Sequence, residues 1–315
     1  MSKNTLSINS HWKVKLAELP LQSRLCWEHS LRRYSTMRVG GTAACFIDVL
    51  NCEDLSQLLP FIQQYQIPYF VLGKGSNLII PDTGWPGIIL RLSSNFEDWH
   101  IFEEDHLVCV GAALPDVIFA KRSVPLGWSG VEFLIGIPGS IGGAIAMNAG
   151  AHGTEISDHL KTVWWMDMDG NQHQGDRDSL EFSYRSSPLN AVSGSIITSA
   201  LFQLKESDSQ TVKSHMKQFQ SYRETTQPTK IPNCGSVFKN PPGHYAAKLI
   251  ESAGLKGYGI GNAQISEKHS NFIVNQGNAK AADVIALIEL AQDTVWKVHQ
   301  ISLEPEVQLL THAQC

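Results

Sequence analysis

The first hundred residues combine two short apolar runs with a helical pattern of apolar positions. Residues 45–50 (CFIDVL) and 69–72 (YFVL) are rich in β-branched and aromatic residues, which is typical of strands. Between them, four apolar residues recur at the spacing i, i+3, i+4, i+7: Leu55, Leu58, Leu59 and Ile62. This spacing predicts a helix over residues 54–65 that ends before Pro68. A strand, a helix and a second strand in this order predict a βαβ unit with parallel strands.

The middle of the chain, residues 88–205, has a different pattern, in which short apolar runs alternate with glycine-rich turns. We expect strands at residues 163–168 and 195–204, and a turn at residues 169–170 (DG). The centre of this block, residues 134–153 (LIGIPGSIGGAIAMNAGAHG), is unusually dense in glycine and alanine. We therefore expect the block to be mostly strands joined by glycine-rich turns.

The last third of the chain begins near residue 209 with a polar helical stretch, and a second helical pattern covers residues 281–300. The apolar face of that second helix is predicted to consist of Ala282, Ile285, Ile288, Leu290 and Val295. Residues 303–307 (LEPEV) are expected to be extended, because a proline disfavours the helical conformation in the residue before it. Residues 1–23 show no clear pattern, and we expect them to form a loosely ordered extension.

Composition and charge restrict the class of protein. A chain of 315 residues with 43% hydrophobic and 17% charged residues suggests two or three domains, each with a buried core. The net charge of −5 is spread over both signs, so we expect no nucleic-acid partner. There is no run of about 20 apolar residues that could span a bilayer, and no apolar core of a signal peptide. We expect a soluble, cytoplasmic protein without a membrane partner.

Six cysteines are spread along the chain without a CxxC pair: Cys26, Cys45, Cys52, Cys109, Cys234 and Cys315. This spacing matches neither a disulfide framework nor a zinc site. We therefore expect reduced thiols and no metal.

A glycine-rich loop directly follows the strand predicted at residues 69–72. The loop consists of Gly73, Lys74, Gly75, Ser76 and Asn77. Its backbone N–H groups and its polar side chains can surround one anion, such as a phosphate. The glycines are not spaced as GxGxxG, and the next residues predict a strand rather than a helix, so a Rossmann fingerprint is disfavoured. A simple tight turn remains an alternative at this point.

A second glycine cluster lies within residues 136–150. Its candidate cofactor-binding residues are Gly136, Gly139, Ser140, Gly142, Gly143, Asn148 and Gly150. Two such segments in one chain suggest that a dinucleotide pyrophosphate is held between the first two blocks. Close packing of small residues around a helix is the alternative explanation.

Several segments resemble the UDP-N-acetylenolpyruvoylglucosamine reductases, a family also called UDP-N-acetylmuramate dehydrogenases. The matching segments are residues 35–43 (STMRVGGTA), 72–77 (LGKGSN), 130–150 (GVEFLIGIPGSIGGAIAMNAG), 234–242 (CGSVFKNPP), 247–275 and 303–307 (LEPEV). Each motif is weak alone, whereas their order and spacing together are highly specific. The resemblance extends over residues 24–310. The short connection between residues 184–187 and the strand expected at 195–204 resembles the second type of this family, which lacks an inserted tyrosine-bearing loop.

The resemblance implies an α+β architecture. It consists of a two-subdomain FAD-binding fold of the vanillyl-alcohol-oxidase (PCMH) type and a C-terminal α+β substrate-binding domain. We place the boundaries at residues 1–23 for the N-terminal extension, 24–90 and 91–208 for the two FAD-binding subdomains, and 209–315 for the substrate-binding domain. We expect a monomer.

The resemblance also implies a reaction, the NADPH-dependent reduction of UDP-N-acetylglucosamine enolpyruvate to UDP-N-acetylmuramate in peptidoglycan precursor synthesis. Non-covalently bound FAD would transfer hydride from its N5 atom. Arg185 and Glu306 match the family's residues that stabilise the enolate, and Ser236 matches its proton donor. A guanidinium suits this role because it binds a carboxylate bidentately and keeps its charge. Glu306 would orient Arg185, whereas Glu304 is expected to be a solvated neighbour.

The remaining assignments rest on the same resemblance. Tyr184 is expected near the flavin, and the expected substrate contacts are Lys239, Asn240, Gln264 and His269, with Lys268 as a further candidate. The chain departs from many relatives at Gly259, Asn262 and Thr311. The first departure puts one cationic contact to the substrate phosphates in doubt, and none removes a catalytic group.

Two other functions are compatible with the flavin loops. One is a different FAD-linked oxidoreductase, such as an oxidase acting on a sugar or a hydroxy acid, although that function would leave Arg185, Ser236 and Glu306 unexplained. The other is a catalytically inactive module that binds a flavin or a nucleotide sugar, and the intact set of three residues argues against it.

Overall fold

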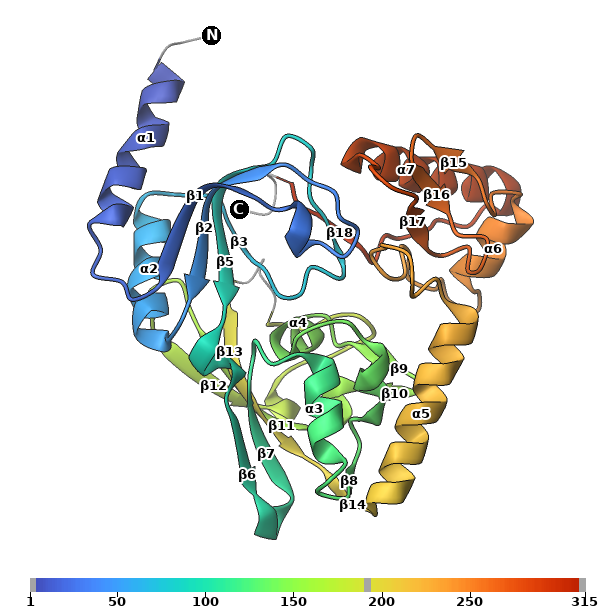
Figure 1. The fold of residues 1–315 in the computed structure, drawn as a ribbon, viewed down its shortest axis with the longest axis horizontal. Helices are drawn as coiled ribbons and strands as arrows, with labels where there is room; N and C mark the ends of the chain where they lie inside the picture. Colours follow the sequence, from blue (N-terminus) through green and yellow to red (C-terminus); the bar gives the residue numbers. More distant parts are fainter. Residues whose placement is uncertain (1–3, 190–193, 312–315) are drawn as a thin grey trace.

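The computed structural model describes residues 4–189 and 194–311, and their side chains from residue 11 onward. The first block contains a four-stranded sheet with the order β1 (Arg24–Ser30), β2 (Thr42–Val49), β5 (Trp85–Leu92) and β3 (Tyr69–Val71) (Figure 1). Both β2 and β3 run parallel to β5, so the predicted βαβ unit is confirmed, with β5 inserted between its two strands.

Helix α2 (Cys52–Gln64) confirms the helix predicted between these strands. It begins where the Asn51 side chain accepts a hydrogen bond from the Asp54 N–H at 2.8 Å, which satisfies one free donor of the first turn. The four periodic apolar residues are all buried against the sheet: Leu55, Leu58, Leu59 and Ile62.

The expectation of a loosely ordered N-terminus is wrong for most of these residues, because α1 (Asn4–Ala17) is a helix, and its C-terminal part lies near α2 (Figure 1). Trp12 and Leu16 are buried in the same core as α2. Among the helix residues whose side chains are described, from residue 11 onward, Trp12 and Leu16 are the buried ones, at the spacing i and i+4, while Val14 between them is exposed. Such a short apolar stripe is too weak to be recognised as a helical pattern.

The second block contains a five-stranded antiparallel sheet. Its order is β12 (Gln172–Asp176), β11 (Leu160–Met166), β13 (Ile196–Gln203), β7 (Leu107–Gly111) and β6 (Trp99–Phe102). The strands expected at residues 163–168 and 195–204 are therefore confirmed. Helices α3 (Asp116–Ser123) and α4 (Ile141–Ala146) pack on this sheet, with Phe119 and Ile141 in the shared core. Helix α4 lies in the glycine cluster, where glycine lowers helix propensity and hides the helix from a sequence pattern.

Helix α5 (Ser209–Thr226) is the polar helix expected after residue 209. Val212 and Met216 are buried in the core of the second block, and the helix runs from that block towards the third (Figure 1). The boundary that we placed between residues 208 and 209 stays a prediction. Helix α5 begins at this boundary, yet its Val212 and Met216 pack in the core of the second block.

The third block contains α6 (Ala246–Ser252), α7 (Ala281–His299) and a small sheet of β15 (Gly259–Ile260), β16 (Ala263–Ile265) and β17 (Ile273–Asn275). The long helix is confirmed, but its predicted apolar face is only partly correct. Ile288 and Val295 are buried, whereas Ala282 is exposed and Ile285 and Leu290 are half-buried. The buried face is formed instead by Ala281, Val284, Leu287, Ile288, Ala291 and Val295. Met37 and Val39 of the first block complete this core.

Two short pairings connect distant segments. Strand β4 (Leu78–Ile79) runs parallel to β18 (Gln308–Leu309), and β8 (Trp128–Ser129) pairs with β14 (Lys205–Glu206). A third short pairing, of β9 (Gly150–Ala151) with β10 (Thr154–Glu155), is a local hairpin. The β4–β18 pair brings the C-terminal segment beside the first glycine loop. It is the pairing most directly involved in building the site described below.

Three further properties concern only the described part of the chain. None of its helices is long and apolar enough to cross a bilayer. Five cysteines are free thiols, and Cys315 lies outside the described residues. No three His, Cys, Asp or Glu side chains in this part are grouped as metal ligands.

Candidate active site

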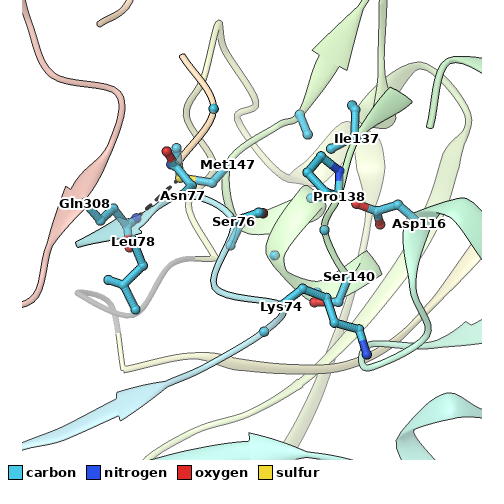
Figure 2. A pocket seen from close by; sticks show the side chains of 18 of the residues that line it. Lys74, Ser76, Asn77, Leu78, Asp116, Ile137, Pro138, Ser140, Met147 and Gln308 are labelled. Atoms are coloured by element: carbon cyan, nitrogen blue, oxygen red, sulfur yellow. Dashed lines mark hydrogen bonds between the residues drawn. The ribbon is translucent and has the colours of Figure 1, made fainter. Parts of the chain in front are cut away.

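A cavity of about 1860 Å³ is lined by residues of all three blocks. Figure 2 shows one part of it, where the loop before Leu78 faces the segment from Ile137 to Ser140. The volume exceeds the roughly 300–1,000 Å³ of ordinary small-molecule sites. The cavity can therefore hold a dinucleotide and a second ligand together.

The first glycine loop forms one wall of the cavity, and all five of its residues line it. Gly75 has a φ of +62°, and a Cβ atom there would lie 1.9 Å from the Tyr34 carbonyl oxygen. Only glycine fits this position. The Thr36 N–H donates a hydrogen bond to the Gly75 carbonyl at 3.0 Å, which holds the loop against the preceding segment.

The second glycine cluster forms the facing wall. Its lining residues are Gly136, Gly139, Ser140, Gly142, Gly143 and Gly150. The two walls meet, because a Cβ atom on Gly73 would lie 2.7 Å from the Ser140 Oγ atom. The packing explanation also has a basis, since a Cβ on Gly142 would lie 3.0 Å from the Ala112 Cβ atom. The glycines thus both pack closely and leave backbone groups at the cavity surface.

Asn148, which we expected to bind the cofactor, is not among the residues that line the cavity. It is fully buried, and its side-chain amide donates to the Glu155 Oε2 atom at 2.7 Å and to the Ser183 carbonyl at 2.9 Å. Its own carbonyl accepts a hydrogen bond from the Arg185 Nη1 atom at 3.4 Å. The geometry makes Asn148 a support for the segment that carries Arg185.

Arg185 lies between β12 and β13 and lines the cavity with Tyr184. Its backbone is in the left-handed region at a φ of +54°, which is uncommon for a residue with a side chain. The Nη2 group donates to the Gly150 carbonyl at 2.7 Å, and the Nε group donates to the Glu306 Oε1 atom at 3.0 Å. The guanidinium also lies 5.0 Å from the centre of the Tyr184 ring. These contacts fix the orientation of the cation.

Glu306 is held from both sides of the cavity. Its backbone N–H donates to the Val237 carbonyl at 2.8 Å, and its own carbonyl accepts from the Asn77 side chain at 3.0 Å. Burial raises the pKa of the Glu306 carboxyl above its ordinary value, while the nearby Arg185 cation opposes this shift. A carboxyl group with a raised pKa can retain a proton and donate a hydrogen bond more readily than a solvated one.

Ser236 also lines the cavity, one residue before Val237. Its segment is fixed by Asn271, whose carbonyl accepts from the Val237 N–H at 2.8 Å and whose side chain exchanges two hydrogen bonds with the Phe238 backbone. The structure therefore brings Arg185, Ser236 and Glu306 to one cavity, although Arg185 and Glu306 are 121 positions apart in the sequence.

Of the expected substrate contacts, Lys239 and Asn240 line this cavity. Lys239 pairs with Glu304 at 2.6 Å, and the Glu304 side chain is 71% exposed, which agrees with the solvated role expected for it. Gln264 and Lys268 line a separate cavity of about 500 Å³. His269 lines neither cavity.

His269 is instead held within the third block. Its Nδ1 atom accepts a hydrogen bond from the Asn271 N–H at 3.3 Å, its ring packs edge-on against Phe272, and burial lowers its pKa. The structure thus gives no support to substrate contacts by Gln264 and His269. Two of the three departures from the relatives, Gly259 and Asn262, belong to the hairpin of β15 and β16, away from the main cavity.

Several cavity residues were not predicted from the sequence, among them Asp116, Tyr222, Arg223 and Tyr245. Tyr222 and Tyr245 are exposed by 57% and 62%, so their rings are accessible to a ligand. Tyr222 and Arg223 lie in the polar helix α5, where a single aromatic or basic residue forms no pattern. Asp116 was invisible for the same reason, since one acidic residue near a helix start is ordinary.

Two family profiles match the chain. Residues 227–310 match the profile described as "UDP-N-acetylenolpyruvoylglucosamine reductase, C-terminal domain", and residues 43–175 match "FAD binding domain". The first match begins where α5 ends, and the second includes both glycine segments.

Curated relatives match over almost their whole length. The UDP-N-acetylenolpyruvoylglucosamine reductase of Halalkalibacterium halodurans is 42% identical over 281 residues, which is 89% of this chain and 92% of the relative. That of Trichlorobacter lovleyi is 41% identical over 294 residues, or 93% and 95%. The crystal structure of UDP-N-acetylenolpyruvylglucosamine reductase from Thermus caldophilus aligns with a TM-score of 0.78 at 35% identity, covering 92% of this chain and all of the other.

Proposed function

The chain belongs to the UDP-N-acetylenolpyruvoylglucosamine reductase family, and we propose that it reduces UDP-N-acetylglucosamine enolpyruvate to UDP-N-acetylmuramate with NADPH as the reductant. The family membership and the FAD-binding-domain match make it an FAD-dependent oxidoreductase of peptidoglycan precursor synthesis with an α+β FAD-binding fold. The substrate, the reductant and the roles of individual residues are the content of the proposal.

The main cavity suits a flavin dinucleotide. Its two glycine walls expose backbone groups at a place where an added Cβ would collide with neighbouring atoms, and its volume is about 1860 Å³. Ser76 and Asn77 add polar groups, and Lys74 adds a cation, which together favour a bound pyrophosphate. When bound, FAD supplies the transfer of hydride from NADPH to the enolpyruvyl carbon.

Arg185 has the position and charge needed to bind the carboxylate of the enolpyruvyl group and to stabilise the negative charge that develops beside it. Glu306 orients the guanidinium through the contact at 3.0 Å and offers a carboxyl group to the enol oxygen. Because both side chains are more than four-fifths buried, their interactions are weakly screened by water.

Ser236 acts in this proposal as the donor of the proton to the carbon adjacent to the carboxylate. A serine hydroxyl is a weak acid, so it can donate only to a strongly basic carbon within hydrogen-bond reach. The hydrogen bonds of Asn271 to the neighbouring residues Val237 and Phe238 keep the serine segment in place for this contact.

The observation that carries the proposal is the ion pair of Arg185 and Glu306 between the flavin loop and the Ser236 segment. A sugar or hydroxy-acid oxidase on the same fold would not need this combination, and neither would an inactive binding module. We further propose that the protein is a cytoplasmic monomer with domains at residues 24–90, 91–208 and 209–315, preceded by residues 1–23.

An anaerobic stopped-flow experiment at the flavin absorbance band tests the proposal. Purified holoenzyme is mixed first with NADPH and then with UDP-N-acetylglucosamine enolpyruvate. We expect bleaching by NADPH and rapid recovery after the enol ether is added. Bleaching without recovery would indicate a different electron acceptor, and a protein that binds no FAD after reconstitution would refute the proposed function.

A further inference from the structure

Asp116, the first residue of α3, is fully buried, and neither of its carboxyl oxygens has a hydrogen-bond partner among the described residues. Buried polar side chains almost always have such partners, and a buried group without one is costly. Asp54 in α2 is a useful comparison because it is equally buried. Its carboxylate accepts hydrogen bonds from the Gln22 N–H at 3.2 Å and from both the N–H and the hydroxyl of Ser23.

The position of Asp116 connects it to the second glycine wall. It lines the main cavity, and Figure 2 shows its carboxyl group turned towards Pro138. The Asp116 N–H donates to the Gly139 carbonyl at 3.2 Å, and Pro115 pairs with Ser140 in an isolated bridge. A Cβ atom on Gly139 would lie 2.3 Å from the Asp116 Oδ2 atom. The carboxyl therefore occupies the space that this glycine leaves free, directly behind the proposed pyrophosphate cradle.

The cation that acts on the pKa of Asp116 is Lys74, which makes no hydrogen bond to it. The Lys74 side chain is 41% exposed and lies 3.9 Å from the Glu97 carboxylate. Burial raises the pKa of the Asp116 carboxyl well above its ordinary value, and Lys74 offsets only part of this effect. Burial therefore favours the protonated form of Asp116, and neither carboxyl oxygen has a hydrogen-bond partner among the described residues.

We propose that Asp116 is a ligand of the bound flavin dinucleotide and donates a hydrogen bond to a phosphate oxygen beside Gly139. A neutral acid can approach a pyrophosphate without the repulsion that a carboxylate would experience. The proposal rests on the proposed function, since it needs FAD in the main cavity. It also explains why a buried carboxyl group lacks a partner in the protein itself.

The test compares FAD binding by flavin-free wild-type, Asp116→Ala and Asp116→Asn proteins, with Asp54→Asn as the matched buried control. FAD affinity is measured by quenching of flavin fluorescence, and the rise in Tm on adding FAD is measured in parallel. We expect Asp116→Ala to weaken FAD binding about tenfold and to reduce the FAD-dependent rise in Tm. Asp116→Asn keeps a neutral donor and should stay within about threefold of the wild type, as should Asp54→Asn.

A purely structural role predicts a different result. In that case Asp116→Ala would lower the Tm of the flavin-free and the FAD-bound protein equally and leave the FAD affinity unchanged, which would overturn the proposal. Equal weakening by Asp116→Ala and Asp116→Asn would also overturn it, because a charged carboxylate would then be the required group. If the wild type itself fails to bind FAD, the proposed function fails together with this inference. If the wild type binds FAD tightly and Asp116→Ala binds it equally well, only this inference fails.

Discussion

The side chain of Asn77 donates a hydrogen bond to the backbone carbonyl of Glu306 at 3.0 Å, and this contact joins residues 229 positions apart. The Gln308 N–H returns a bond to the Asn77 carbonyl at 3.0 Å, as part of the β4–β18 pairing. The last residue of the proposed flavin loop is therefore attached directly to the segment that carries Glu306, the carboxyl group proposed to be catalytic. Cofactor binding and the placement of Glu306 are structurally linked.

Asn77→Ala tests this link. Removal of the amide leaves the Glu306 carbonyl without its donor, so the carboxyl should be less well positioned relative to Arg185. We expect kcat to fall about tenfold, as a small displacement of a catalytic group commonly causes. Steady-state kinetics measure the effect, with Asn171→Ala in the exposed turn after β11 as the control. A kcat equal to that of the control would show that the contact does not position Glu306.

Arg185→Lys keeps the positive charge but loses the planar fork that contacts Gly150 and Glu306. We expect reoxidation of the flavin by the enol ether to slow by about 10²–10³-fold, the usual loss when a donor that stabilises developing charge is removed. Flavin reduction by NADPH should keep its rate. Stopped-flow traces of the two half-reactions separate these effects, and Arg177→Lys on the surface is the control. Equal slowing of both half-reactions would contradict the assignment.

Ser236→Ala should also act on one half-reaction only. Loss of the proposed proton donor is expected to slow flavin reoxidation by about 10²–10⁴-fold, the range for general acid–base groups, while NADPH still bleaches the flavin. The matched control is Ser179→Ala, at an exposed position outside the cavity. Reoxidation at the wild-type rate would remove Ser236 from the mechanism and leave solvent as the proton source.

The raised pKa of Glu306 predicts how stability depends on pH. Between the unfolded and the folded pKa, the folded chain holds a proton that the unfolded chain has released. The stabilisation is complete below the unfolded pKa and is lost as pH rises through the folded pKa, with a slope of at most about 1.4 kcal/mol per pH unit. The unfolding free energy of the wild type should therefore fall relative to Glu306→Gln over this range. Urea denaturation from about pH 4 to pH 8 measures it, and parallel curves would contradict the shift.

The sequence predicted the local elements well and the long-range arrangement poorly. Helices α2 and α7 were found because their apolar residues recur over two turns or more. The insertion of β5 between β2 and β3 could not be found in this way, since pairing partners far apart leave no periodic trace. Helix α1 was missed because two buried residues, Trp12 and Leu16, make too short a pattern.

The site was predicted mainly through the family resemblance rather than through local pattern. Arg185, Ser236 and Glu306 come from three separate segments, and no spacing rule relates them. The glycine cluster gave no information about side-chain direction. It led us to expect Asn148 among the cofactor ligands, whereas the fold turns its side chain towards Glu155 and Ser183.

This direction of Asn148 yields the last prediction. If the residue supports the Arg185 segment, Asn148→Ala should lower kcat for the enol ether by about 10-fold or more while FAD affinity stays near the wild-type value. A cofactor ligand would show the opposite, with weakened FAD binding.

Asn275→Ala is the matched control for Asn148→Ala. Asn275 is also buried, and its amide donates to the Met37 carbonyl at 2.9 Å in the core of the third block. We expect this control to lower Tm without a comparable loss of kcat. Flavin titration, thermal unfolding and steady-state kinetics on both variants therefore distinguish a positioning role from a general effect on stability. If both variants lose kcat and Tm to the same extent, Asn148 has a structural role only.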